Sequence, residues 1–155
     1  MSAVVVSVRV KASPAEAFEV FTQDIAAWWR PNGLFELTPR GDGVLRFDDQ
    51  ARLVTTLSSG KEFEIGRVTA WRPGERLSFS WRQASFTPDQ TTYVEVRFEA
   101  VGEETRVTVE HRGWDAIPQE HTARHGLPLS ATQLRLAEHW RSLLAAYAGR
   151  LVPSG

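Results

Sequence analysis

The stretch that decides the fold is TYVEVRFEAVGEETRVTVEHRGW, residues 92–114. Its two halves alternate between apolar and charged residues with period two, and a Gly-containing turn joins them, which predicts an antiparallel β-hairpin. Val94 and Phe98 share one face of the first strand, and Val107 and Val109 share one face of the second. Glutamate and arginine occupy the opposite faces, where opposite charges on neighbouring strands mark a solvated surface. One side of this sheet is therefore expected to be wet and the other covered.

The same period extends outward from the hairpin over residues 34–114, which predicts a meander of about six strands separated by turn residues. Within it, Phe63 and Ile65 share one phase of the alternation, whereas Val68 and Ala70 share the other. Gly66 lies where the phase changes, so we expect a β-bulge or a sharp bend at this position.

Helical segments flank the meander. After a short first strand, Ser13 and Glu16 form a capping box around Pro14, and the helix that they begin must end by Arg30 because Pro31 follows. A second, longer helix is expected to begin near Ser130, which pairs with Gln133 in a capping box, and to end at about residue 151. It carries a broad apolar stripe formed by Ala137, Trp140, Leu144, Tyr147 and Leu151, widened by Leu136 and Leu143. A sheet covered on one face by helices is an α+β arrangement in two layers, here in a single domain over residues 1–155.

The composition excludes several classes of function. The 155 residues carry a net charge of −1 with no basic block, so they lack an electrostatic footprint for nucleic acid. The chain has no cysteine, which removes disulfides, thiolate nucleophiles and Cys-based zinc sites. No apolar run approaches the length that spans a bilayer, and no signal peptide is recognisable. We therefore expect a cytoplasmic protein without membrane insertion and without a cofactor.

Short motifs along the chain occur in a specific order: Trp28-Trp29-Arg30-Pro31, Pro39-Arg40-Gly41, Gly66-Arg67-Val68, Trp71-Arg72-Pro73, Arg76-Leu77, Trp81, Thr105-Arg106-Val107 and Glu110-His111-Arg112-Gly113-Trp114. In this order they resemble the bacterial SRPBCC-domain proteins labelled activator of Hsp90 ATPase homologue-like, of the START/Bet v 1-like superfamily. The resemblance covers about residues 4–151. It implies a helix-grip fold, in which a bent antiparallel sheet wraps around a long C-terminal helix. Thr38 and Ile65 depart from the family pattern, where a glutamate and an aromatic residue are expected.

A helix-grip fold leads us to expect a cavity between sheet and helix that binds a small hydrophobic or amphipathic molecule. Such sites have apolar walls and a few polar groups. The expected lining is Trp28, Trp29, Phe35, Leu37, Phe79, Trp81, His111, Trp140 and Tyr147. His111 falls in the apolar phase of its strand, either as a core or rim histidine with a hydrogen-bond partner or as a polar handle or general base. A solid core without a cavity is the alternative.

Other functions compete with ligand binding. The superfamily includes cyclases and hydrolases that would use the same cavity, although we expect that this chain is not an enzyme. A co-chaperone-like interaction is a further alternative, but the eukaryotic co-chaperone carries an additional N-terminal domain for which this chain has no room. Helix-grip dimers make a homodimer an expectation.

Two further groups of polar residues could form binding sites, but each also has an ordinary structural interpretation. His121 and His125 are four residues apart beside Glu120, but no third ligand is spaced to complete a metal site. We therefore expect a solvated loop or short helix there. Arg67, Arg76 and Arg82 could place a cation at the cavity mouth, although exposed strand arginines usually pair with carboxylates.

Overall fold

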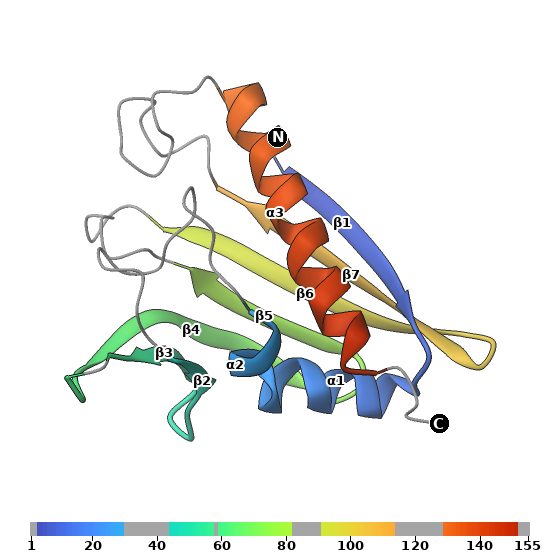
Figure 1. The fold of residues 1–155 in the computed structure, drawn as a ribbon, viewed down its shortest axis with the longest axis horizontal. Helices are drawn as coiled ribbons and strands as arrows, with labels where there is room; N and C mark the ends of the chain where they lie inside the picture. The colour runs from blue at the N-terminus through green and yellow to red at the C-terminus, as the bar shows by residue number, and fades with distance from the viewer. Residues whose placement is uncertain (1–2, 30–43, 58, 82–90, 114–128, 152–155) are drawn as a thin grey trace.

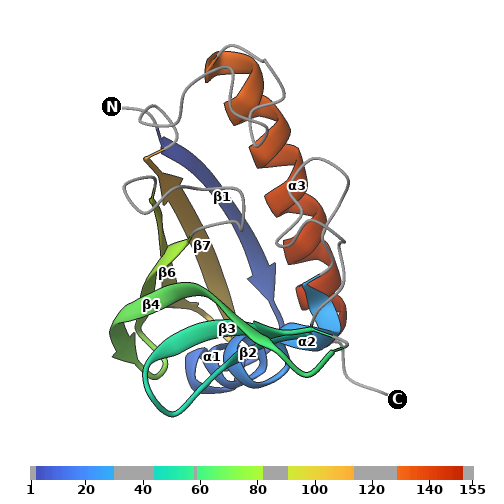
Figure 2. The same ribbon diagram turned by 90° about the vertical axis from the view of Figure 1, so that its left-hand side faces the viewer.

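The computed structural model describes residues 3–29, 44–57, 59–81, 91–113 and 129–151. A single antiparallel sheet with the strand order β1-β7-β6-β5-β4-β3-β2 forms one layer, and helices lie against one side of it (Figures 1 and 2). The elements in chain order are β1 (Ala3–Val10), α1 (Pro14–Gln23), α2 (Ile25–Trp28), β2 (Val44–Phe47), β3 (Arg52–Thr56), β4 (Glu62–Arg72), β5 (Arg76–Trp81), β6 (Thr92–Val101), β7 (Glu104–Arg112) and α3 (Leu129–Gly149). This bent seven-stranded sheet with its long C-terminal helix is the helix-grip fold that the sequence predicts. No helix in the described ranges is both long and apolar enough to cross a membrane.

The first helical segment begins as its sequence predicts and then divides in two. Ser13 is the N-cap of α1, where its hydroxyl accepts the Glu16 N–H at 3.2 Å, and Pro14 occupies the first helical position. At Asp24 the backbone leaves helical geometry, with φ −101° and ψ 17°, and the short helix α2 follows. Trp29 ends α2 in an extended conformation, one residue before Arg30.

Gly66 produces the predicted bulge in β4. Leu53 of β3 is opposite Gly66, whereas the next residue, Val54, is opposite Glu64, so Ile65 is the extra residue of the bulge. A Cβ atom at position 66 would lie 1.6 Å from the carbonyl oxygen of Ser80 on β5. The close approach of these two backbones therefore requires glycine.

The core lies between the inner face of the sheet and the helices. The inward residues Val94, Val96, Val107 and Val109 of the hairpin that decides the fold are at most 1% exposed. The outward residues carry ion pairs, including Arg97 with Glu110 at 3.5 Å. The stripe of α3 covers the inner face, since Leu136, Trp140, Leu144 and Tyr147 are buried as expected. Helix α3 starts at Leu129, so Ser130 is already helical rather than a cap.

Candidate functional site

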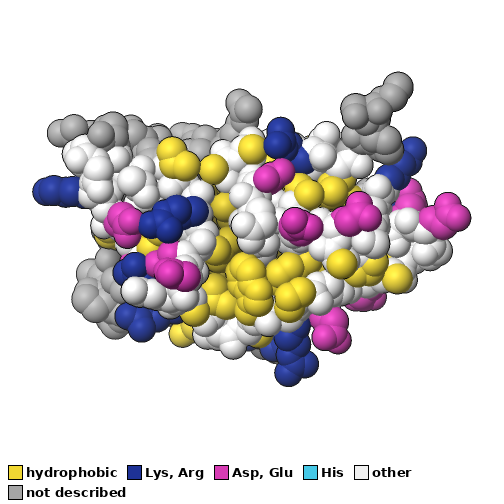
Figure 3. All heavy atoms as spheres, turned by 90° about the horizontal axis from the view of Figure 1, so that it is seen from below, with side chains coloured by type: hydrophobic (Ala, Val, Ile, Leu, Met, Phe, Trp, Pro, Cys, Tyr) yellow, Lys and Arg dark blue, Asp and Glu magenta, His cyan; other side chains and the backbone are white. Residues whose placement is uncertain are grey.

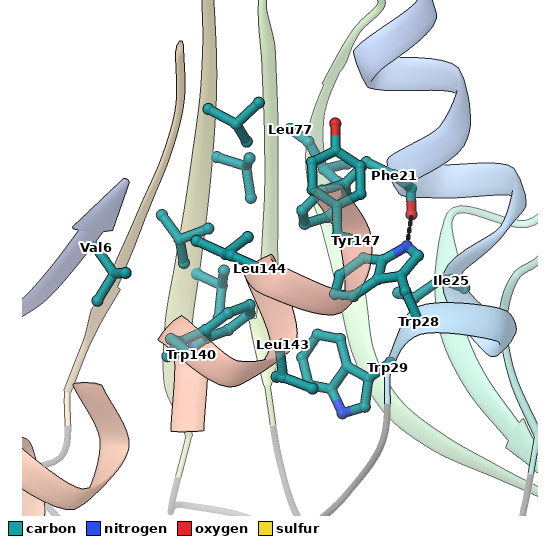
Figure 4. Close-up of a cluster of buried hydrophobic side chains, with 14 of the residues drawn as sticks. Val6, Phe21, Ile25, Trp28, Trp29, Leu77, Trp140, Leu143, Leu144 and Tyr147 are labelled. Atoms are coloured by element: carbon teal, nitrogen blue, oxygen red, sulfur yellow. Dashed lines mark hydrogen bonds between the residues drawn. The ribbon is translucent and has the colours of Figure 1, made fainter. Parts of the chain in front are cut away.

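The structure gathers seven of the nine predicted lining residues into one buried cluster. Trp28, Trp29, Phe79, Trp81, His111, Trp140 and Tyr147 are each at most 5% exposed. They come from α2 and its C-cap, from β5, from β7 and from α3, and several of them face one another in Figure 4. Phe35 and Leu37 lie outside the described residues.

Trp28 and Tyr147 form one part of this cluster, in which the polar atom of each ring is hydrogen-bonded. Their ring centroids are 5.4 Å apart, and Phe21 packs against both rings. The Trp28 indole N–H donates to the Phe21 carbonyl at 3.3 Å, and the Tyr147 hydroxyl donates to the Ala17 carbonyl at 2.6 Å. Because the polar atom of each ring bonds to backbone of α1, these two residues hold the helices together.

His111 lies at the centre of a second, more polar part of the cluster. The Trp140 indole N–H donates to His111 Nδ1 at 3.1 Å, so Nδ1 carries no proton. His111 Nε2 is 2.8 Å from the Thr92 hydroxyl, and the O–H of that hydroxyl donates to the Trp81 carbonyl at 2.9 Å. The arrangement is self-consistent for a neutral imidazole that carries its proton on Nε2 and donates it to the Thr92 oxygen.

Burial keeps both histidines of this region neutral. Desolvation, together with repulsion from His139, lowers the pKa of His111 to about 3, and desolvation lowers the pKa of His139 to about 4. A group with such a pKa is a weak general base at neutral pH. The geometry and the pKa therefore fit a neutral core histidine better than a catalytic base.

Trp29 provides an unsatisfied polar atom at the edge of the cluster. Its ring meets the Trp140 ring edge-on, with centroids 5.0 Å apart, and the residue is 5% exposed. Its buried Nε1 has no hydrogen-bond acceptor among the described residues. In Figure 4 this nitrogen points away from Trp28.

Sequence reasoning did not include His139 among the buried residues of this region. It is 6% exposed, and repulsion from it adds to the desolvation that lowers the pKa of His111. The signal was its spacing on α3, three residues after Leu136 and four before Leu143, which places it on the buried face.

Of the other polar candidates, the two described arginines, Arg67 and Arg76, do not join the cluster. Arg67 pairs with Glu64 at 3.4 Å and Arg76 with Glu95 at 3.0 Å, both as surface ion pairs. Arg82, His121 and His125 lie outside the described residues. Within the described ranges, no group of three or more His, Asp or Glu side chains is placed to hold a metal ion.

The sequence matches the model of a known protein family. The family model described as "Activator of Hsp90 ATPase homolog 1-like protein" matches residues 11–138. The chain belongs to this family. No curated protein matches the sequence significantly.

Several solved structures of other proteins share the helix-grip fold. The Aha1 dimer from Colwellia psychrerythraea has a TM-score of 0.63 at 16% identity and covers 97% of this chain and 96% of its own. DynU16, a protein of the dynemicin biosynthetic locus, has a TM-score of 0.67 at 21% identity over 97% of this chain and 47% of its own. Txn09, an anthrahydroquino-γ-pyrone synthase, has a TM-score of 0.55 at 27% identity over 96% of both chains. An HSP90 activator from Plasmodium falciparum has a TM-score of 0.62 at 17% identity and covers 94% of this chain and 92% of its own. Proteins with this fold thus include biosynthetic proteins and an Hsp90 activator.

Proposed function

We propose that the protein binds a small, mostly apolar molecule with a hydrogen-bond acceptor, beside Trp29 and Trp140. The observation that carries this proposal is the buried Trp29 Nε1, for which no described residue is an acceptor. Leaving a buried donor unsatisfied costs about 1–3 kcal/mol. An acceptor atom of a ligand would remove that cost, whereas a purely apolar ligand would not.

The surroundings of Trp29 favour a flat aromatic ligand. The cluster offers indole rings from α2, β5 and α3, and stacked or edge-on aromatic contacts each contribute about 0.5–1.5 kcal/mol beyond area burial. The proposed ligand would contact the rings of Trp29 and Trp140 and leave the packed pair of Trp28 and Tyr147 in place.

The comparisons support the same ligand class. The name of Txn09 denotes a fused aromatic product with oxygen acceptors, and this relative is 27% identical over 96% of both chains. A polycyclic aromatic compound with carbonyl oxygens is therefore our first candidate. Such a ligand combines the apolar body that the indoles require with the acceptor that Trp29 requires.

A matched pair of probes tests the acceptor directly. Anthraquinone-2-carboxylate and anthracene-2-carboxylate share the ring shape and the charge, but the quinone alone has ring carbonyls. Titrated against the protein by calorimetry, the quinone should bind about tenfold more tightly. Trp29→Phe should abolish that preference, while Trp71→Phe, a change at a surface tryptophan, should leave it intact. Equal binding of both probes, or an unchanged preference in Trp29→Phe, would contradict the proposal.

Catalysis in the same site is the second candidate function, and the synthase name of Txn09 is the observation that favours it. His111 is poorly suited to be its base, because both ring nitrogens have hydrogen-bond partners within the core and its pKa is about 3. Incubation with a polycyclic polyketide-type substrate and mass spectrometry of the mixture would reveal turnover. Recovery of unchanged substrate would count against catalysis.

The homodimer stays a prediction, which size-exclusion chromatography with light scattering would test.

A further inference from the structure

A pocket that does not include Trp29 lies beside the turn between β2 and β3. It has a volume of about 240 Å³ and is lined by Asp48, Asp49, Ala51, Val68 and Trp71. Trp71 contacts Phe18 of α1 and Phe47 of β2, at centroid distances of 5.2 and 5.7 Å. Figure 3 looks at the side of the molecule that carries these elements and shows apolar side chains gathered at its centre among charged ones. This volume lies just below the range of ordinary small-molecule sites.

The rim of this pocket is organised by the turn between β2 and β3. The Asp48 side chain is 4% exposed, accepts the backbone N–H groups of Gln50 and Arg52, and pairs with the Arg52 guanidinium at 2.7 Å. These contacts hold the pKa of Asp48 below its usual value despite desolvation, which opposes them. The charge of Asp48 is therefore already neutralised within the protein.

Ala51 shows that the turn is held under strain. Its φ is 59°, which makes it the non-glycine residue with positive φ in the described part of the chain. A residue in this region costs on the order of 1 kcal/mol and persists where its surroundings determine it. Its carbonyl accepts the Val68 N–H at 2.8 Å, which fixes the turn against β4 beside the pocket. The pocket is thus formed before any ligand arrives.

The charge that remains at the rim belongs to Asp49. Its side chain is exposed, and no ion pair or hydrogen bond of its carboxylate is present among the described residues. No cationic side chain lines the pocket in the described chain. Trp71, which is 41% exposed, adds an aromatic ring, whose face attracts cations.

We propose that this pocket binds a small organic cation, with its apolar part against Trp71 and Val68 and its ammonium or guanidinium group at Asp49. An apolar floor would take the body of such a molecule, and the unpaired carboxylate and the indole would both favour the positive charge. An anion would be repelled by the Asp49 carboxylate, and a neutral molecule would form no ion pair with that carboxylate. This proposal is independent of the ligand proposed beside Trp29.

The test uses benzylammonium and its neutral analogue benzyl alcohol at pH 7, followed by amide chemical shifts in ¹⁵N-labelled protein. Benzylammonium at roughly millimolar concentration should give saturable shifts at residues 48–51 and 68–71, and benzyl alcohol should bind more weakly. Asp49→Asn should lower the affinity for benzylammonium about twofold to fivefold and leave that for benzyl alcohol unchanged. Glu103→Gln, a change of an exposed carboxylate in the turn between β6 and β7, is the matched control.

The remaining outcomes overturn the proposal. Equal affinity for the cation and the alcohol would show an apolar hollow without charge selection. Shifts outside residues 48–51 and 68–71, or none at all, would show that the cation binds elsewhere or not at all. Asp49→Asn keeps a side chain of the same shape on an exposed turn, so loss of the fold does not confuse the result. Failure here leaves the Trp29 test unaffected, because that test uses anionic probes and different residues.

Discussion

At the scale of single residues, Gly66 is the described glycine with the least room for a side chain. Replacing it with alanine would put a methyl group 1.6 Å from the Ser80 carbonyl oxygen, and backbone atoms can move away only by breaking the pairing of β4 with β5. We expect Gly66→Ala to lower the free energy of unfolding by about 3 kcal/mol or more, measured by urea denaturation. Gly149→Ala is the control, because a Cβ there meets no atom within 4 Å. Equal stability of the two variants would contradict the role of Gly66.

The buried histidines predict a loss of stability in acid. An unfolded histidine takes up a proton near pH 6.5, whereas folded His139 does so at about pH 4 and folded His111 at about pH 3. The unfolded chain therefore binds more protons between these values, so the free energy of unfolding falls as the pH drops from about 6.5 toward 4.

Carboxylates also titrate in this range, so the measurement compares two proteins. In His139→Gln the contribution of His139, up to about 1.4 kcal/mol per pH unit, should disappear from the slope of stability against pH. Urea midpoints at pH 7, 6 and 5 provide that slope for the wild type and the variant. Identical slopes would mean that His139 is not held neutral by burial.

At the scale of elements, Tyr147 joins the C-terminal helix to the first one. Its hydroxyl donates to the Ala17 carbonyl of α1 at 2.6 Å, in a region where both residues are fully buried. Tyr147→Phe should cost about 1 kcal/mol in thermal or urea unfolding, since the ring remains and one buried hydrogen bond is lost. Tyr93→Phe, at a residue that is 48% exposed, should be nearly neutral. If both variants unfold alike, this bond does not hold α3 against α1.

At the scale of the whole molecule, the sheet order predicts where the fold opens first. β6 and β7 are paired on both sides, whereas β2 is a four-residue strand at one edge of the sheet. Amide hydrogen exchange should be slowest in β6 and β7 and faster in β2. Protection of β2 equal to that of β7 would show that the edge is covered by something beyond the described residues.

Prediction from sequence succeeded where the cause is local. The capping box at Ser13 depends on neighbours three residues apart, and the bulge at Gly66 follows from a change of phase within one strand. The division at Asp24 was not predicted, because Phe18, Phe21 and Ile25 keep a helical spacing across it. His139 was not predicted to be buried, because a polar side chain on a helix is usually exposed, although its spacing places it on the buried face.

The amino-acid sequence by itself determined the order of the elements, which faces are apolar and the helix-grip class, because periodicity and capping act over a few residues. Only the tertiary structure decided which polar atoms of the cluster have hydrogen-bond partners. It paired Trp140 with His111 across 29 positions and Tyr147 with Ala17 across 130, and it left the Trp29 N–H without a described acceptor. Hydrogen-bond geometry and burial arise from elements distant in the chain, and no local pattern records which polar atom finds its partner.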